Sequence, residues 1–486
     1  MKKTILIAVA LINLNFFSAF FCSKNSFRIK GWEGASCSAQ TISGGLFHSI
    51  FLCNNNIPKS CGWNFSGQLG DGTNTDQSTP VQVSSLAGII AIAAGGNHSL
   101  YLKNDGTVWA CGQNDNGQLG DGTILDKSIP VQVSSLSGIT AIAVGAFHQS
   151  LFLKNDGTVW TCGYNGGGEL GDGTTIERHT PVQVTSLSGI VAMAGGEFHS
   201  LFLKSDGSVW ACGLNQYGEL GNGTTNTDST PVQINSLSGI TAIAAGRWNS
   251  LFLKNDSTVW ACGYNGAGQL GDGTTVDKYT PVQVSSLNAI KSIAGGHDHS
   301  LFLQKNGTVW ACGWNGVGQL GDGTTTDRHT PVQVTSLSAI TAIAGGFAHS
   351  IFQKNDGTVW TCGDNGHGQL GNGTTNADST PVQVIDLCTL ATALETNSNE
   401  NDVSIFPNPC TFRTTISTNK EIKNATIKIV DILGNEVTPL LGRGARSEVF
   451  SGKEIIIEKG ELRAGVYFVQ IISEKKIIVK EKIVIQ

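Results

Sequence analysis

The chain has 486 residues, 40% of them hydrophobic, so it is long enough for two or three domains with packed cores and is not a disordered protein. Its 62 glycines lack the three-residue period of collagen and therefore predict many tight turns. The net charge is −6, and the acidic excess lies before residue 403, which argues against nucleic acid as a partner because phosphate binding depends on clustered lysine and arginine.

The first 22 residues read as an export signal. Lys2 and Lys3 precede an apolar run from Ile5 to Phe21. A charged start followed by an apolar stretch is typical of a secretory signal peptide, so we expect residues 1–22 to be removed on export. The alternative is a retained membrane anchor. It fits less well, because the run is barely long enough to span a bilayer and contains two asparagines.

A unit of about 50 residues then recurs seven times. In the second copy it contains Trp109–Asn114, Gly117–Thr123 and a closing Pro-Val-Gln at Pro130. One interval between copies is 51 residues, and the first copy has Lys59 in place of the tryptophan. Such a long, regular period indicates a repeat architecture in which each unit packs against its neighbours.

Within one unit the side-chain pattern has a period of two, which predicts β-strands. Ser99–Lys103 and Thr107–Cys111 flank an Asn-Asp-Gly turn that is typical of a hairpin. Pro130–Val133 and Ile139–Ala143 predict a third and a fourth strand. Four short strands in each unit predict a propeller blade, so the expected fold is all-β with a seven-bladed β-propeller over residues 37–388.

The unit resembles the regulator of chromosome condensation repeat. Its signature, Gly-x-x-His-Ser followed by Trp-x-x-Gly-x-Asn-x-x-Gly-Gln-Leu-Gly, is present at Gly196–Ser200 and Trp210–Gly221, with Glu219 in the glutamine position. The resemblance implies the seven-bladed propeller that the strand pattern also predicts. It brings guanine-nucleotide exchange on a small GTPase as an alternative function, which export and the lack of a basic chromatin-binding tail argue against.

The ring has to close where the chain enters and leaves the repeats. Thr41–Gly45 aligns with the fourth strand of a unit but precedes the first hairpin, so we expect this strand to complete the last blade. Cys37 and Cys388 both align with Ala87, in the turn between units, and we expect a disulfide between them. The alternative is that Thr389–Leu394 closes the ring and leaves both thiols free.

Histidine and cysteine recur at one position in each blade. We expect the cysteines to be small buried hydrophobic residues and the histidines to bond neighbouring turns, in preference to redox, metal or acid–base roles. The Asp-Gly-Thr loops lack the dense carboxylates of calcium sites. The sequence thus predicts no catalytic group, metal or cofactor. The positions are Cys61, Cys111, Cys162, Cys212, Cys262, Cys312 and Cys362, and His48, His98, His148, His199, His299 and His349, with Asn249 in the fifth blade.

Positions that differ between blades carry more functional information. The loop before each His-Ser strand and the loop after each Cys-Gly are expected on the same face, because the strands that lead into these two loops run in the same direction. Aromatic residues and arginine are common at recognition surfaces, although each could instead pack against an adjacent blade. The candidate binding residues are Trp63, Phe147, Tyr164, Phe198, Arg247, Trp248, Tyr264, His297, Trp314 and His367.

A linker at residues 389–402 leads to a tail at residues 403–486, for which we expect a small C-terminal β-sandwich. The predicted strands cover residues 425–430, 455–458, 466–472 and 476–485.

The tail resembles the type A sorting domain of the type IX secretion system. The matching elements are Pro407–Pro409, Ile429–Gly434, Leu462–Val469 and Lys482–Val484. The resemblance implies the type IX machinery as a partner and a tail that is cleaved, with the protein released or attached to surface lipopolysaccharide as its only membrane association. The sorting-signal residues are Pro407, Asn408, Pro409, Gly434, Gly465, Tyr467 and Lys482.

These features predict a secreted or outer-membrane cell-surface protein that binds a protein or glycan ligand. The remaining alternative is a propeller enzyme with its active site in the central channel. It lacks support in the sequence, because no blade-specific set of acid, base and nucleophile is visible.

Overall fold

The computed structural model describes residues 41–53, 55–146 and 148–387, and in the tail the strands between Val403 and Ile485. The chain divides into two compact units, Met1–Thr389 and Leu390–Gln486. The expected signal peptide, residues 1–22, lies outside the described residues. Among the described residues, no helix is long and apolar enough to cross a membrane.

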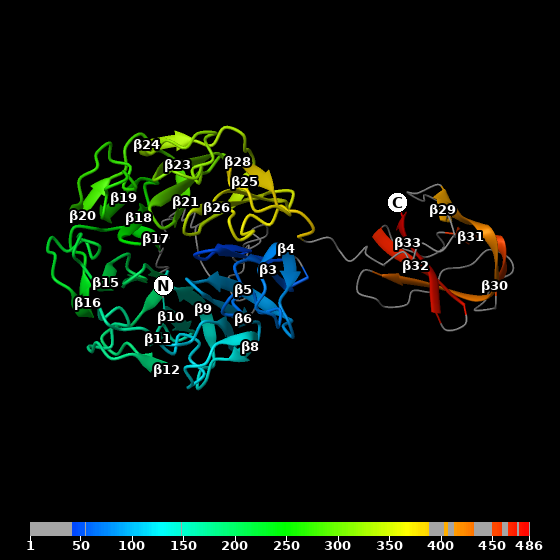
Figure 1. The fold of residues 1–486 in the computed structure, drawn as a ribbon, viewed down its shortest axis with the longest axis horizontal. Coiled ribbons are helices and arrows are strands. Elements are labelled where there is room, and N and C mark those ends of the chain that lie inside the picture. Colours follow the sequence, from blue (N-terminus) through cyan, green and yellow to red (C-terminus); the bar gives the residue numbers. More distant parts are fainter. Residues whose placement is uncertain are drawn as a thin grey trace, which may run out of the picture. The chain divides into compact units, whose positions relative to one another are not determined.

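The first unit consists of seven four-stranded antiparallel sheets arranged around a centre (Figure 1). This confirms the seven-bladed propeller. The first four blades are β1 (Ile42–Gly44), β2 (His48–Leu52), β3 (Pro58–Gly62) and β4 (Gln77–Gln82); β5 (Ile89–Ala94), β6 (His98–Lys103), β7 (Val108–Gly112) and β8 (Lys127–Gln132); β9 (Ile139–Val144), β10 (Gln149–Lys154), β11 (Val159–Gly163) and β12 (Arg178–Gln183); β13 (Ile190–Gly195), β14 (His199–Lys204), β15 (Val209–Gly213) and β16 (Asp228–Gln233).

The remaining three blades repeat this arrangement. They are β17 (Ile240–Ala245), β18 (Asn249–Lys254), β19 (Val259–Gly263) and β20 (Lys278–Gln283); β21 (Ile290–Gly295), β22 (His299–Gln304), β23 (Val309–Gly313) and β24 (Arg328–Gln333); β25 (Ile340–Gly345), β26 (His349–Lys354), β27 (Val359–Gly363) and β28 (Asp378–Gln383).

The core lies between adjacent blades. The second strand of a blade is covered on both faces, and in β6 every residue except Lys103 is buried. Leu100 and Val108 of the second blade pack in one cluster with Ile142 and Phe152 of the third. The outermost strand is the most exposed, and it carries the proline of each repeat because an edge strand tolerates a missing backbone donor.

The prediction that the N-terminal strand completes the last blade is wrong. β1 pairs with β2, with Ile42 opposite Phe51, and β28 completes the seventh blade, so every blade is one continuous segment. The strand taken as the fourth of a repeat is the first strand of the next blade. The first and seventh blades therefore share no sheet. Gly373 N donates to Ser78 O at 2.9 Å to join them, and the equivalent bond joins every other pair of neighbouring blades.

The tail contains β29 (Val403–Phe406), β30 (Arg413–Asp431), β31 (Phe450–Glu458), β32 (Gly465–Ser473) and β33 (Lys476–Ile485). They form one five-stranded sheet in the order β29-β30-β32-β33, with β31 also paired to β30. All four predicted tail strands are present. A second sheet is not established among the described strands, so the sandwich stays a prediction.

Candidate functional site

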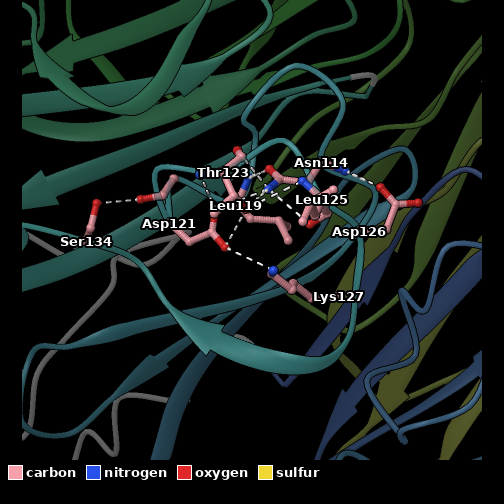
Figure 2. Close-up of polar contacts among 9 residues, drawn as sticks. Asn114, Leu119, Asp121, Thr123, Leu125, Asp126, Lys127 and Ser134 are labelled. Atoms are coloured by element: carbon pink, nitrogen blue, oxygen red, sulfur yellow. Dashed lines mark hydrogen bonds and ion pairs between the residues drawn. The ribbon is translucent and has the colours of Figure 1, made fainter.

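One buried asparagine holds the loop after the third strand of each blade. In the second blade, Asn114 Nδ2 lies 3.0 to 3.3 Å from Asp121 Oδ1, Thr123 O, Thr123 Oγ1 and Leu125 O (Figure 2). The amide nitrogen therefore lies where these oxygens converge and shares its two hydrogens among them. In the described part of the chain, no group of three His, Cys, Asp or Glu side chains is placed to hold a metal.

Five of the repeated histidines join neighbouring blades, which confirms their structural role. Each Nε2 lies 3.0 Å from a serine Oγ of the next blade. Burial lowers the pKa of these imidazoles to about 3 or 4, so they are neutral at neutral pH. The pairs are His48–Ser99, His98–Ser150, His199–Ser250, His299–Ser350 and His349–Ser49.

His148 does not belong to this set, contrary to the sequence alignment. Gln149 occupies the position, opposite Gly163 in the β-ladder, and its Nε2 donates to Gly196 O at 3.1 Å. One extra residue in this loop accounts for the 51-residue interval. His148 lies one position earlier, in the loop, where its Nδ1 is 3.0 Å from Gln118 Nε2.

The seven repeated cysteines are free and fully buried, which confirms that they act as small hydrophobic residues. Each Sγ lies 3.5 to 3.7 Å from a backbone oxygen in the loop of the preceding blade. Burial raises the pKa of every one of these thiols, so they are poor nucleophiles. Cys37 and Cys388 lie outside the described residues, and their disulfide stays a prediction.

The two variable loops of each blade do emerge on the same face. Trp63 N donates to Phe47 O at 2.7 Å, and the equivalent bond joins Tyr264 N to Trp248 O at 2.8 Å. We call the surface formed by residues 45–47, residues 63–66 and their equivalents the variable-loop face. Phe147 belongs to these loops but lies outside the described residues.

Most candidate aromatic side chains on this face gather into three clusters, each at a seam between blades. Ring centroids within a cluster are 5.0 to 6.5 Å apart. Trp314 stands apart and lies over Gly316 of its own loop. The clusters are Phe47, Trp63, Phe65, Phe347 and His367; His148, Tyr164 and Phe198; and Tyr217, Trp248 and Tyr264.

The first variable loops also surround the mouth of the central channel, a cavity of about 150 Å³. Backbone bonds run from blade to blade around it, including Glu197 N to Arg247 O at 3.0 Å and Arg247 N to His297 O at 3.1 Å. Glycines line its wall because the blades approach closely there: a Cβ on Gly195 would lie 2.5 Å from Val144 O.

One arc of this mouth carries charged side chains that differ in every blade. Arg247 pairs through Nε with Glu197, and its guanidinium carbon lies 3.6 Å from the ring centroid of Trp248. His297 Nδ1 lies 2.7 Å from Asp298 Oδ2, and its Nε2 is 3.9 Å from Glu197 Oε2. Burial raises the pKa of Glu197 and lowers that of His297.

Sequence reasoning missed Glu197 and Asp298, and also Phe65 and Tyr217 in the aromatic clusters. Phe65 is 73% exposed, which is unusual for an aromatic side chain. All four vary between blades, so a comparison of every loop position would have singled them out. Their contacts with residues about 50 positions away could not be read without the blade packing.

Models of known families cover almost all of the described chain. The RCC1-like domain matches residues 38–289, and the regulator of chromosome condensation repeat matches residues 306–353 and 356–391. The chain belongs to the RCC1-like family. The secretion system C-terminal sorting domain matches residues 404–486.

Solved structures agree on the fold of this RCC1-like chain. Prp20p from Saccharomyces cerevisiae, studied for its binding to Gsp1p and histones, superposes with a TM-score of 0.61 at 24% identity, covering 75% of this chain and 90% of that one. Human WBSCR16 gives a TM-score of 0.58 at 22% identity, covering 64% and 86%. At these identities the likeness concerns the fold alone.

A curated relative matches only in part. An endo-acting ulvan lyase of Formosa agariphila is 41% identical over 86 residues, which are 16% of this chain and 15% of the lyase. The chain thus spans a small fraction of that enzyme, and the match carries no activity over to the RCC1-like propeller.

The sorting domain implies secretion or a cell-surface location and an interaction with the type IX secretion machinery. Of its predicted signal residues, Gly465 and Tyr467 lie in β32 and Lys482 in β33, where Phe468 is opposite Lys482. The other four, Pro407–Pro409 and Gly434, lie outside the described residues.

Proposed function

We propose that this protein acts outside the cell as a non-catalytic binding or adhesion protein whose ligand docks on the variable-loop face. The observation that carries the proposal is that the aromatic clusters occur at three particular seams between blades and lie on the one face where the repeat varies. Large aromatic side chains at the centre of a surface provide most of the binding energy in recognition sites.

A binding role fits the chemistry of the repeated groups better than catalysis does. The histidines are neutral and bonded to serines, and the cysteines are buried thiols of raised pKa. Nucleotide exchange on a cytosolic GTPase is disfavoured by the sorting tail. We further propose that the tail folds as a small sandwich and is cleaved, with the propeller released or attached to surface lipopolysaccharide.

The proposal is tested with the full chain on a glycan array and on whole cells. Replacement of Trp63, Trp248 and Trp314 by alanine together should weaken binding at least tenfold, because aromatic anchors are worth about 2 kcal/mol or more each. The matched control replaces three exposed apolar residues of the outer strands and loops by alanine and should bind normally. Equal binding by both variants would refute the assignment. The control residues are Ile129, Val276 and Tyr279.

A further inference from the structure

We propose that a disulfide between Cys53 and Cys388 joins the first blade covalently to the end of the seventh. The inference goes beyond the proposed function and does not depend on it. Cys53 directly follows β2 and is disulfide-bonded. Cys388 directly follows Leu387, the last described residue of the propeller, and itself lies outside the described residues. This pairing replaces the one between Cys37 and Cys388 that the sequence alignment favours.

The joint of the ring, the seam between the seventh and the first blade, lacks a covalent link that every other seam has. Each blade is one continuous segment, so the main chain passes from one blade to the next at all the other seams. Residues 83–88, for example, lead from β4 to β5. At the joint, the chain does not pass between the two blades. A disulfide there supplies the missing covalent link and restricts the unfolded chain.

The end of the seventh blade follows the path of an ordinary connection between blades. At the seam between the first and second blades, Leu86 packs in one cluster with Tyr101. At the joint, Leu387 packs in the equivalent cluster with Phe51, which occupies the position of Tyr101. Leu387 therefore fills the place of Leu86, and we expect the residue that follows it to take the place of Ala87.

The sixth blade shows that the positions of the two cysteines are in contact. Gln304 occupies the position of Cys53, and Asn288 occupies the position of Cys388. Gln304 Nε2 donates to Asn288 O at 3.0 Å and to Asn288 Oδ1 at 3.2 Å. At the joint, Cys53 Sγ lies 3.2 Å from Leu387 O, which belongs to the peptide bond that leads to Cys388. The two sulfur atoms are therefore placed to meet, as a disulfide requires.

The first blade has lost the residues that other blades carry at this place. In five blades, a lysine at the position of Cys53 lies 4.6 to 5.9 Å from the ring centroid of a tryptophan at the position of Lys59. Both partners are replaced in the first blade, and Lys59 Nζ donates to Asp386 O at 2.7 Å instead. The two replacements thus direct both side chains to the end of the seventh blade.

Cys37 is the competing partner for Cys53, because it also aligns with Ala87. One place cannot hold two segments of the chain, and Leu387 already leads into this place from the seventh blade. Cys388 is the residue next to Leu387, whereas nothing in the described contacts of Cys53 leads to Cys37. We therefore expect the disulfide to use Cys388 and to leave Cys37 as a thiol.

Formation of the bond needs an oxidant, and a protein that carries a reactive disulfide of its own can supply it. One of the two cysteine thiolates attacks that disulfide, forms a mixed disulfide and releases one sulfur of the oxidant. The other thiolate then attacks the cysteine sulfur of the mixed disulfide, and the second sulfur leaves. Two electrons pass to the oxidant, and its two sulfurs take up the two protons. Such exchange proceeds outside the cytosol, where the sorting domain directs this chain.

Peptide mapping of the full chain under non-reducing conditions tests the pairing. Free thiols are alkylated first, and the chain is then cut with trypsin and chymotrypsin, because cleavage at Phe47 separates Cys37 from Cys53. We expect peptides joined through Cys53 and Cys388 that separate on reduction, with Cys37 recovered in alkylated form. Alkylated Cys53, or a bond from Cys53 to any other cysteine, would overturn the proposal.

Thermal unfolding of the full chain measures the contribution of the bond. Cys53→Ser and Cys388→Ser should each lower the midpoint by about 4–10 °C, because either change removes a link across a long loop. The double variant should lose no more than either single variant, since both changes remove the same bond. Cys37→Ser is the matched control and should leave the midpoint unchanged. Additive losses in the double variant, or an equal loss with Cys37→Ser, would contradict this pairing.

Discussion

The buried loop network and the loops at the channel mouth lie in the same blades and follow opposite rules. Asn114 and its equivalents are identical in all seven blades and make nearly the same bonds. By contrast, the position of Arg247 lines or borders the mouth in six blades and holds a different residue in each of them. These residues are leucine, alanine, glutamate, arginine, histidine and phenylalanine.

The difference teaches how this propeller separates stability from recognition. Around the mouth, backbone groups bond from blade to blade, as Phe347 N does to Gly45 O at 3.0 Å. Those bonds do not depend on the side chain, so the mouth residues are free to vary. Asn114 has no such freedom, because its own side chain makes the contacts. Four perturbations probe this contrast.

Lowering the pH should have the largest effect, a loss in the free energy of unfolding that comes from the repeated buried histidines. Five buried histidines have a pKa of about 3 or 4, below 6.5 in the unfolded chain, so the unfolded state binds more protons below pH 6.5. The contribution of these histidines is fully present above pH 6.5 and should fall by about 3 kcal/mol per histidine by pH 4. Urea unfolding at pH 7, 5.5 and 4 measures this, and an unchanged midpoint would contradict it.

Removal of one network asparagine should have the next largest effect. Asn114→Ala leaves the Leu119 amide and several loop oxygens without their partner, so we expect a loss of about 3 kcal/mol in the free energy of unfolding. The exposed Gln216, in the equivalent loop two blades away, provides the control, and Gln216→Ala should change it by less than about 0.5 kcal/mol. Similar losses of stability in both variants would contradict the contrast between the buried asparagine network and the variable loops.

Glu169 is a variable residue placed in the buried interior, and it should cost stability at high pH. Burial raises its pKa to about 7 from 4.5, so its favourable contribution is present below pH 4.5 and is lost as pH rises to 7. Glu169→Gln should therefore stabilise the fold by about 1–3 kcal/mol at pH 8 and have little effect at pH 4.5. Gln319→Glu makes the reverse change and should show the opposite pH dependence in the same denaturation series.

Asn249 interrupts the series of His–Ser bonds between blades, and replacing it by histidine should have the smallest effect on stability. Both side-chain amide atoms of Asn249 are buried and unpaired in the described structure. Gly246 leaves room beside this position, as Gly196 does for His199. Asn249→His should reach Ser300 and stabilise by about 1 kcal/mol. The gain should disappear in the double variant that also carries Ser300→Ala, and a loss of stability in the single variant would speak against the account.

Much of the fold was predictable because seven copies report the same strand pattern. The residue at which each blade begins was not predictable, because the repeated sequence looks the same whichever strand is taken as the first. Thr41–Gly45 was therefore assigned to the last blade when it belongs to the first. His148 was misplaced because one inserted residue shifts the alignment locally. The variable-loop face followed from the strand directions and is confirmed by the bond between Trp63 N and Phe47 O.

The channel-mouth arc was beyond sequence reasoning, because it depends on three blades meeting. Glu197, Arg247 and His297 are 50 residues apart in the chain, and only the closed ring brings them together. At the joint of the ring, Cys53 Sγ lies 3.2 Å from Leu387 O, and Cys53 is disulfide-bonded. Non-reducing peptide mapping distinguishes the pairing of Cys53 with Cys388 from the pairing of Cys37 with Cys388 that the sequence alignment favours.

Hydrogen–deuterium exchange with a bound glycan tests the central claim most directly, that the ligand docks where the blades differ. The full chain is measured with and without a glycan that the array shows to bind. The account predicts slower exchange in residues 45–48, 63–66 and their equivalents, and unchanged exchange in the Asn-Asp-Gly hairpins such as residues 103–107. Protection of the hairpins, with the variable loops unchanged, would contradict it.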